Sequence, residues 1–549
     1  MHMTMNKKRD YTAWLPVAIA ISTVVGIVVG IFMGNPFSND KYNTQSDRKL
    51  NMILNLIAQE YVDDSINTKD LVEMSIPLIL SNLDPHSSYL TPKETKASKE
   101  NLAGKFQGIG VVLQSLKDTA IVMEVIQNGP SDRAGLMPGD KIVTINDSTC
   151  VGPKFPNTEI VQRLRGPKGT KVKVGIKRND SNKLMGFELT RGDIPSHSVA
   201  SSYMIDKTTG YVNVTQFISN THMEFVNALN SLKNEGAKRF IVDLRGNPGG
   251  YVEVVIGMVN EFLPANRLIM SSKSRYRRDD QKAYSDGRGL FQDEELVVLI
   301  DETSASASEI FAGAIQDNDR GLIVGSRSFG KGLIQKEFPL PDHSSIHLTV
   351  AKYYTPSGRC IQKPYDKGLL AYQSENIIDR FSNGELFTKD SIKIDTTKVF
   401  LTTTGRKVYG GGGIIPDIFV PIDTTSSNVY FRAALNNGLF HSYALKYASE
   451  HRSSLSQMSD YKQLLRNLPA NDDLLNDFVN YAAANGIPTR WYYIRLAEDR
   501  ITSVLKAFIA RDILGQVAFY PIINRGDKTI EAAMKALNKH KAAFPITNY

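Results

Sequence analysis

The stretch GYVNVTQFISNTHMEFVNALNSLKNEGAKRFIVDLRG, residues 210–246, decides the fold class of this chain. It contains an apolar strand, an amphipathic helix and a second apolar strand that ends in a glycine turn, the order of a strand–helix–strand unit. The segments that continue this alternation begin at Tyr251 (helix), Leu296 (strand), Ser306 (helix) and Leu322 (strand). We therefore predict an α/β core over residues 193–424.

The composition limits the class of protein. Of 549 residues, 42% are hydrophobic and 22% are charged, which is typical of a globular protein with a large core and several domains. The net charge of +8 is modest at this length, and the densest basic run, residues 273–280, is interrupted by its own acidic residues. We therefore expect no nucleic-acid partner.

The sequence indicates neither metal nor disulfide chemistry. Cys150 and Cys360 are the only cysteines, so there is no disulfide framework and no thiolate cluster for zinc. His343 and His347 are the only closely spaced histidines, and on a strand they would lie about 13 Å apart, too far to share a metal ion. We expect no metal and no cofactor.

Residues 14–33 form an uncharged apolar run that is long enough to span the hydrocarbon core of a bilayer. Lys7, Lys8 and Arg9 precede the run, and such positive flanks stay in the cytoplasm. We therefore expect a cytoplasmic N-terminus (residues 1–13) and a single-pass anchor (residues 14–34), with all later residues outside the cytoplasm. No small-x-small cleavage site follows the run, which favours an uncleaved anchor over a signal peptide.

Helical patterns flank the rest of the chain. Apolar residues recur at helical spacing from Leu50 to Ile57, and a second amphipathic segment, TKDLVEMSIPLILSNL, follows and ends at the turn Asp84-Pro85-His86. These patterns predict a helical region over residues 35–103. After Val420 the pattern is helical again, so we expect a helical C-terminal extension over residues 425–549, to which no motif assigns a chemistry.

Between these regions, residues 104–192 have the pattern of a small β-rich module. Short strands (GIGVVLQ, TAIVMEV, DKIVTI and KVKVGIKR) alternate with Gly and Pro turns, and one short helix is expected from Thr158 to Leu164. A plain turn before a strand would explain FQGIG by itself, but together with AGLMPGDKIVTIND the module resembles a PDZ domain. That resemblance implies that a peptide's terminal carboxylate binds the FQGIG loop, formed by Phe106, Gln107, Gly108, Ile109 and Gly110, while the peptide adds as a strand to Val111–Leu113.

Ser306, in SASASEI, and Lys331, in FGKG, are the strongest candidates for catalysis. A serine hydroxyl needs a base, and a lysine can act as that base only if desolvation lowers its pKa from about 10.4. Ser306-x-x-Glu309 is also a capping box, so a plain helix cap is the alternative reading. The two roles are compatible, because free N–H groups at a helix start suit an oxyanion.

Two other glycine-rich segments admit more than one interpretation. Residues 325–331 fit the GxxxxGK of a phosphate-binding loop, but the next residue is Gly332 rather than Ser or Thr, and a strand follows where that motif needs a helix. DLRGNPGG, residues 243–250, places a glycine turn after a strand, either for close approach to a ligand or simply as a turn. GGGG at residues 410–413 has the same ambiguity.

Taken in order, DLRGNPGG, SASASEIFAGAIQDN, GSRSFGKGLIQ, TVAKYYTPSGRCIQ and GGGGIIPD resemble the carboxy-terminal processing (tail-specific) proteases, serine peptidases with a PDZ domain. LDPHSSYLTPKE is also similar to that family, so the resemblance covers about residues 50–422. It implies a protease core of the ClpP/crotonase type with an inserted PDZ domain.

The resemblance also implies roles for individual residues. Ser306 would be the nucleophile, Lys331 the general base and Gln335 the residue that orients it; on a strand, residues four apart face the same side, so these last two could meet. The oxyanion donors would be the N–H groups of Ala307 and of Gly249 or Gly250. Asp317 matches an acid that some members need, and a surface helix acid is the equal alternative.

We therefore predict a serine endopeptidase anchored in the inner (cytoplasmic) membrane, with its catalytic part in the periplasm or an equivalent compartment. Its substrates would be proteins or peptides whose free C-termini the PDZ-like module captures. The alternatives are an anchored, inactive PDZ scaffold and, through residues 325–332, an ATP-using protein. The sequence does not decide whether the chain forms a homo-oligomer.

Overall fold

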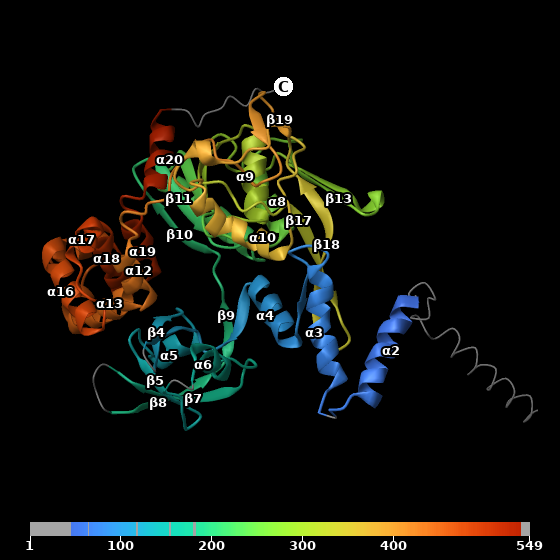
Figure 1. Cartoon of the computed structure of the whole chain (residues 1–549). Coiled ribbons are helices and arrows are strands. Elements are labelled where there is room, and N and C mark those ends of the chain that lie inside the picture. Colours follow the sequence, from blue (N-terminus) through green and yellow to red (C-terminus); the bar gives the residue numbers. More distant parts are fainter. Residues whose placement is uncertain (1–44, 64, 117–118, 153–154, 179–182, 540–549) are drawn as a thin grey trace, which may run out of the picture. The chain divides into compact units, whose positions relative to one another are not determined.

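Figure 1 shows the computed structural model of the chain, which describes residues 45–539 except residues 64, 117–118, 153–154 and 179–182. The predicted cytoplasmic N-terminus and anchor lie outside the described residues. Within the described part, no helix is both long enough and apolar enough to cross a bilayer. The chain divides into two compact units, Met1–Ile79 and Leu80–Tyr549.

The described part of the first unit is helical, as the sequence predicted. It contains α2 (Gln45–Glu60) and most of α3 (Thr68–Ser81). Leu50, Met52 and Ile53 of α2 are exposed.

The core of the second unit is a six-stranded sheet with the order β10–β11–β12–β15–β16–β21. Its strands are β10 (Val199–Met204), β11 (Thr209–Val214), β12 (Arg239–Asp243), β15 (Glu295–Ile300), β16 (Leu322–Gly325) and β21 (Ile418–Phe419). The strands from β11 to β21 pair in parallel, whereas β10 pairs antiparallel with β11. Because helices cover both faces of such a sheet, its strands are almost continuously apolar.

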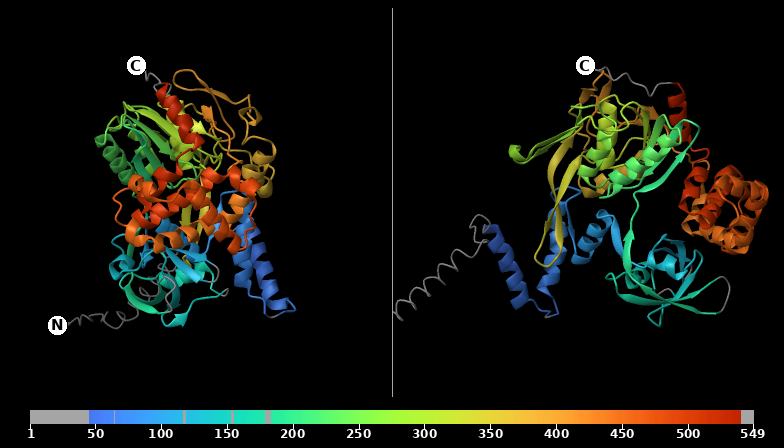
Figure 2. Two further views of the ribbon diagram at one scale, coloured as in Figure 1. Left: turned by 90° about the vertical axis from the view of Figure 1, so that its left-hand side faces the viewer. Right: turned by 180° about the vertical axis from the view of Figure 1, so that it is seen from behind.

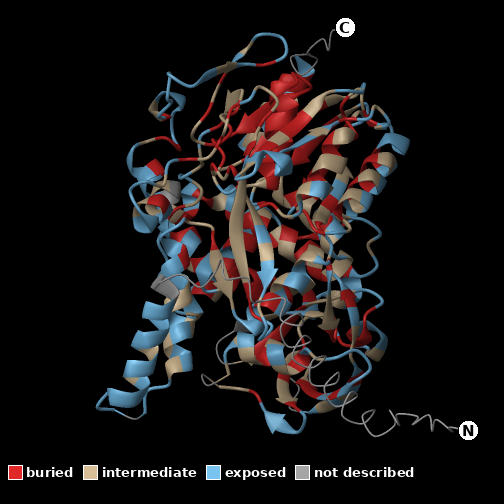
Figure 3. Cartoon of the chain, turned by 90° about the vertical axis from the view of Figure 1, so that its right-hand side faces the viewer, coloured by how far each residue is buried: buried red, intermediate tan, exposed pale blue. Residues whose placement is uncertain are grey.

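Alternate residues of these strands point to opposite faces of the sheet, and each face is covered by different helices. On one face pack α7 (Thr221–Asn234), α8 (Val252–Asn260) and α9 (Ala307–Asp317). On the other face packs α20 (Lys528–Asn538), whose Ile530 and Leu537 contact the sheet (Figure 2). Every residue of α9 is buried. In Figure 3 the strands of this sheet, near the top of the view, are largely buried. The predicted α/β core is therefore present, and α20, the last helix of the described residues, completes it.

A second, antiparallel sheet carries the segments that surround Lys331. It consists of β1 (Ser88–Leu90), β13 (Leu268–Ser274), β14 (Gln281–Tyr284), β17 (Leu333–Pro339) and β18 (Ser345–Tyr354). Both β1 and β17 pair with β18. The DPHSSYL stretch therefore contributes a strand to this sheet, and the strand expected after FGKG is β17.

Between β18 and β21 the chain forms a segment of short elements, which we call the covering segment (residues 363–414). It contains α10 (Leu369–Ser374), a π-helical turn (Glu375–Asp379), α11 (Arg380–Ser382), a 3₁₀ turn (Lys389–Ser391) and the hairpin of β19 (Val399–Leu401) and β20 (Lys407–Tyr409).

The β-rich module is a sheet with the order β3–β4–β5–β7–β8, in which β3 lies at the edge. Its elements are β3 (Val111–Leu116), β4 (Thr119–Val125), α5 (Pro130–Ala134), β5 (Lys141–Ile145), β6 (Ser148–Thr149), α6 (Asn157–Leu164), β7 (Lys171–Lys177) and β8 (Met185–Thr190). The chain enters the module from α4 (Pro92–Leu102) through β2 (Lys105–Gly108) and leaves through β9 (Gly192–Pro195), which pair with each other. The strands and the helix that the sequence predicted are present; α5, β2, β6, β8 and β9 are additional.

The C-terminal extension is helical, as predicted, and most of it has a hydrophobic core of its own. Its helices before α20 are α12 (Val429–Asn436), α13 (Leu439–Glu450), α14 (Arg452–Leu455), α15 (Tyr461–Asn467), α16 (Asn471–Ala484), α17 (Trp491–Leu496), α18 (Glu498–Leu514) and α19 (Gln516–Ile523).

Candidate active site

Ser306 lies where the chain turns from β15 into α9. It is the N-cap residue of α9 and forms the predicted capping box with Glu309. Its backbone has φ 55° and ψ −112°, which non-glycine residues rarely adopt. Such strain costs about 1–3 kcal/mol and is concentrated at functional sites. A sharp, strained turn from strand to helix is also how α/β-hydrolases expose a nucleophilic serine.

Glu309 ties Ser306 to the loop that carries Lys331. Its buried carboxylate accepts hydrogen bonds through Oε2 from the backbone N–H groups of Ser306 (3.0 Å) and Lys331 (2.8 Å). Through Oε1 it accepts from Ser328 Oγ (2.5 Å) and from the N–H of Gly330 (2.7 Å). Burial raises the pKa of Glu309, and these hydrogen bonds act in the opposite direction. The start of α9 and the Lys331 loop therefore share one buried acceptor.

The surroundings of the Lys331 amine change its pKa. Burial lowers the pKa of Lys331, while the carboxylates of Glu309 and Asp84 act in the opposite direction. Burial and, to a smaller extent, the charge of Lys331 lower the pKa of His86 to about 4. Asp84 and His86 are therefore close to this amine. Among the described residues, no direct hydrogen bond joins the side chains of Lys331 and Ser306; Glu309 is the link between their backbones.

Gln335 reaches the surroundings of Lys331 indirectly. Its Nε2 donates to Thr349 Oγ1 (3.1 Å), and Thr349 Oγ1 donates to Asp84 Oδ1 (3.0 Å). Lys331 precedes β17, and the register of β17 shifts immediately before Gln335. The strand alternation on which we based their meeting therefore does not apply to this pair.

The predicted oxyanion residues lie beside Ser306. A Cβ atom on Gly249 would stand 2.8 Å from Ser306 Cβ and 3.0 Å from the Ala307 nitrogen, so only glycine fits there. The N–H of Gly249 donates to Asn247 Oδ1 (2.8 Å). The hydrogen bonds between described residues use the N–H of neither Gly250 nor Ala307. Gly250 and Ala307 are therefore the better pair of donors.

The DLRG turn that precedes these glycines is linked to the C-terminal helix. Arg245 donates from Nε and Nη2 to the Asp243 carboxylate and from Nη1 to Asp527 Oδ2 (2.8 Å). Asp527 is also the N-cap of α20, where it accepts from the N–H groups of Thr529 and Ile530. The glycine-rich turn is therefore held in part by α20.

Asp317 lies at the opposite end of α9 from Ser306, about 16 Å along a helix of this length. It is buried, and its carboxylate accepts from Arg359 Nη2 (2.7 Å) and from Ser357 Oγ (2.7 Å). Asp317 is therefore not a surface helix acid. Its contacts hold the turn after β18, and none of them is to Ser306 or Lys331.

Of the predicted FQGIG loop, Phe106, Gln107 and Gly108 lie in β2, where they pair with β9, so only Ile109 and Gly110 form the loop before the edge strand β3. Gly110 has φ 78°, and a Cβ there would stand 3.1 Å from Ile194 Cδ1, so both conformation and space favour glycine. In the described structure, no hydrogen bond uses the N–H groups of Ile109 and Gly110 as donors. Phe106 packs under the Arg165 guanidinium (4.7 Å), and Gln107 Oε1 accepts from the N–H of Lys168 (3.4 Å).

Two other kinds of site are not supported. The described residues contain no cluster of His, Cys, Asp or Glu that could hold a metal ion. The segment after residues 325–332 is the strand β17, so the helix that a phosphate-binding loop requires does not follow.

Comparison with known proteins agrees with this geometry. Residues 208–368 match Peptidase family S41, and residues 107–189 match the PDZ domain. Residues 430–515 match a family of unknown function (DUF8443). The fold and the matched families together define a serine-type peptidase with a PDZ domain.

The chain belongs to the carboxy-terminal processing proteases. It is 32% identical to the carboxy-terminal processing protease CtpB of Bacillus subtilis (strain 168) over 350 residues, which are 63% of this chain and 71% of the relative. It is also 32% identical to a carboxy-terminal-processing protease of Bartonella bacilliformis over 314 residues, 56% of this chain and 71% of the relative. The predicted family and serine peptidase activity are therefore confirmed, whereas the ClpP/crotonase-type comparison stays a prediction.

The structure also brings residues to the site that the sequence did not single out. Asp84 and His86 come from a turn more than 200 positions before Lys331. A helix cap was all that the sequence indicated for Glu309, because its contacts with the Lys331 loop are not local. The one feature of the sequence that could have drawn attention to Asp84 and His86 is the DPHSS turn, in which Asp84 accepts hydrogen bonds from the backbone of its own turn.

Proposed function

We propose that this carboxy-terminal processing protease is membrane-anchored and works with Ser306 as nucleophile and Lys331 as general base. The observation that carries the proposal is the shared acceptor Glu309, which binds the backbone N–H groups of both residues, at 3.0 and 2.8 Å. The strained backbone of Ser306 and the lowered pKa of Lys331 support the same assignment.

In the first half of the reaction, Ser306 Oγ attacks the carbonyl carbon of the scissile peptide bond while its proton passes to Lys331 Nζ. The tetrahedral intermediate expels the amine of the C-terminal fragment, which takes the proton from Lys331. In the second half, water attacks the acyl-enzyme, Lys331 accepts a proton from that water, and the proton returns to Ser306 Oγ as the ester breaks. Protons balance over the cycle, and the mechanism requires no metal or cofactor.

The oxyanion is stabilised by the N–H groups of Ala307 and Gly250. Gly249 contributes mainly by having no side chain, which allows the backbone to lie close to Ser306. Lys331 is oriented by Asp84, whose carboxylate lies near the amine. Gln335 acts through Thr349, because Gln335 donates to Thr349 and Thr349 donates to Asp84.

The PDZ domain captures the free C-terminus of a protein or peptide substrate. Its edge strand β3 can accept an additional strand, and the N–H groups of Ile109 and Gly110 supply donors for a terminal carboxylate. The prediction is that amidating this carboxylate slows cleavage. Equal rates for amidated and free-acid peptides would exclude tail capture.

Residues 14–34 anchor the protein in the inner membrane, and the protease faces the periplasm or an equivalent compartment. The supporting observation is the uncharged apolar run behind three basic residues. Membrane fractionation together with protease accessibility in spheroplasts tests this arrangement, and release of the chain from membranes by carbonate would contradict it.

The direct test of the catalytic assignment uses Ser306→Ala and Lys331→Ala with a tailed substrate. Both should lower kcat/KM by at least about 10²-fold, the lower end of what a general base contributes. A Ser306→Ala variant that processes the substrate at the parent's rate would contradict the assignment and favour a binding scaffold.

A further inference from the structure

The loop that carries Lys331, residues 326–332, is fixed from two sides; we call it the general-base loop. On the side of α9, the N–H of Phe329 donates to Ser304 O (3.0 Å), and those of Gly330 and Lys331 donate to Glu309. From the other side, the N–H of Ser328 donates to Ile414 O (3.0 Å). These four backbone donors thus find acceptors outside the loop.

The loop's carbonyl groups are bound mainly by one side chain of the covering segment. Arg380 donates from Nη1 to Arg327 O (2.8 Å) and from Nη2 to Ser328 O (2.9 Å) and Phe329 O (3.3 Å). The next carbonyl, Gly330 O, accepts from the N–H of Lys363 (3.0 Å). Four consecutive carbonyl groups immediately before Lys331 are therefore held by the covering segment.

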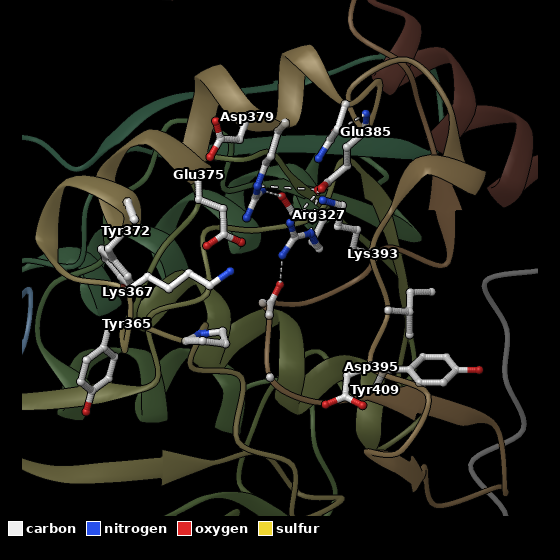
Figure 4. Close-up of a pocket in the computed structure, with 18 of the residues that line it drawn as sticks. Arg327, Tyr365, Lys367, Tyr372, Glu375, Asp379, Glu385, Lys393, Asp395 and Tyr409 are labelled. Carbon is white, nitrogen blue, oxygen red and sulfur yellow. Dashed lines mark hydrogen bonds and ion pairs between the residues drawn. The ribbon is translucent and has the colours of Figure 1, made fainter.

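Arg380 is buried and forms an ion pair with a buried carboxylate. It is 1% exposed, and Glu385 Oε1 lies 3.6 Å from its Nε. Glu385 also accepts from Nε (2.7 Å) and Nη2 (2.9 Å) of Arg327, as the dashed lines between these two residues show in Figure 4. This pair lines a cavity of ≈ 730 Å³ bounded largely by the covering segment. A planar guanidinium that binds several carbonyl groups fixes a loop more precisely than a single ammonium group can.

We propose that Arg380, paired with Glu385, is a positioning residue that fixes the general-base loop so that Lys331 stays desolvated beside Ser306. This inference deepens the proposed function and rests on Lys331 being the base. The match to Peptidase family S41 ends at residue 368, so Arg380 and Glu385 lie beyond it.

The physical reason is the desolvation of the amine. If the loop loosens, water reaches Lys331, its desolvation weakens, and its pKa rises toward the ordinary value. The titratable groups that face this amine are Glu309 from α9 and Asp84 and His86 from the turn before β1. The charged groups that face its loop are Glu302, which accepts from Ser326, and Lys363, Arg380 and Glu385 from the covering segment. Removing Arg380 takes one ion-pair partner from the buried Glu385, which keeps its two hydrogen bonds from Arg327.

The test compares Arg380→Gln with Arg320→Gln as a matched control. Arg320 is also buried and also donates to three carbonyl groups, those of Phe262 (2.8 Å), Phe291 (2.9 Å) and Glu294 (2.6 Å), none of which is in the general-base loop. Both variants should lower the melting temperature. Only Arg380→Gln should move the acidic limb of the kcat/KM profile, and it should move it to higher pH by about one unit. At a given pH on that limb, a shift of one unit means about tenfold less unprotonated Lys331 and therefore a kcat/KM about tenfold lower.

A second readout shows which group titrates, since burial places the pKa of Lys363 at about 8, within the same range. The ¹³Cε resonance of Lys331 is assigned as the lysine signal that disappears in Lys331→Met, and its titration is followed in both arginine variants. The expected result is a higher pKa for Lys331 in Arg380→Gln than in Arg320→Gln, with KM nearly unchanged. Partial restoration in Arg380→Lys is also expected, because that variant keeps one donor group near the same carbonyls.

A milder change covers the case in which Arg380→Gln does not fold. Arg380→Lys keeps the charge beside Glu385, and it should move the Lys331 titration in the same direction by a smaller amount. A Lys331 pKa that does not move in these variants overturns the inference, while the proposed function stands if Lys331→Ala is inactive. An active Lys331→Ala variant overturns the proposed function instead.

Discussion

The carboxylate of Glu309 accepts a hydrogen bond from the backbone N–H of Lys331 at 2.8 Å, through the same oxygen that accepts the N–H of Ser306 at 3.0 Å. One buried residue therefore sets the relative position of the two segments that carry the proposed nucleophile and base. A capping residue of α9 thereby acts as part of the site's framework.

The first prediction concerns Glu309→Gln. The amide group would direct N–H₂ toward backbone donors, and each donor left unpaired in a buried site costs about 1–3 kcal/mol. We expect a lower free energy of unfolding, measured in urea, and a loss in kcat of about 10²-fold from misplacement of the two segments. Glu302→Gln is the control, because Glu302 accepts one bond from Ser326 Oγ (3.0 Å) at the edge of the same loop. Equal kinetic effects in both variants would show that Glu309 has no special role.

The second prediction concerns the cost of burying Lys331. Its folded-state pKa is lowered, so between that value and about 10.4 the unfolded chain binds more protons, and stability rises with pH. Below the folded-state pKa the amine is charged in both the folded and the unfolded chain, so the full free-energy cost of burying that charge is present. Lys331→Met should therefore be inactive and more stable than the parent at pH 7, with a gain that shrinks as the pH approaches 10.4. Urea unfolding at pH 7 and pH 10 measures this, and a variant less stable at pH 7 would refute it.

The third prediction concerns α20. Because Leu537 of α20 is buried against the central sheet, Leu537→Ala should destabilise the protease core by about 2–5 kcal/mol. Hydrogen exchange should show faster exchange in β12 and β15. Lys535→Ala, at an exposed position of the same helix, should change stability by no more than about 0.5 kcal/mol. Faster exchange confined to α12–α19 would mean that α20 does not support the core.

Much of this fold could be predicted from residue patterns. The alternation of apolar strands with amphipathic helices indicated the α/β core because parallel strands are buried on both faces and therefore apolar throughout. The short strands between Gly and Pro turns indicated the β-rich module for an equally local reason. The return of α20 to the sheet could not be predicted, because an amphipathic helix does not specify which surface covers its apolar face.

The site was predictable to a similar extent. Ser306 and Lys331 were identified from their motifs, and Glu309 appeared only as a helix cap. Its second set of partners lies about 20 residues along the chain, and the shift in β17 before Gln335 is set by pairing with β18. Contacts of this kind depend on tertiary structure, which no local pattern encodes.

The fourth prediction separates Asp317 from the catalytic groups. Its carboxylate is paired with the buried Arg359, and removing one partner of a buried pair costs about 3–5 kcal/mol. Asp317→Asn should therefore lower the melting temperature but leave the pH profile of kcat/KM unchanged in the fraction that folds. A shifted profile would instead place Asp317 among the groups that act on Lys331.

The central claim, a lysine kept uncharged by burial beside Ser306, is tested most directly by titrating the Lys331 amine. The protein is labelled with ¹³Cε-lysine in a Ser306→Ala background and loaded with a tailed peptide, and the Lys331 signal is the one that disappears in the Lys331→Met counterpart. The account predicts a pKa clearly below the ordinary lysine value. A Lys331 that titrates at or above that ordinary value would contradict it.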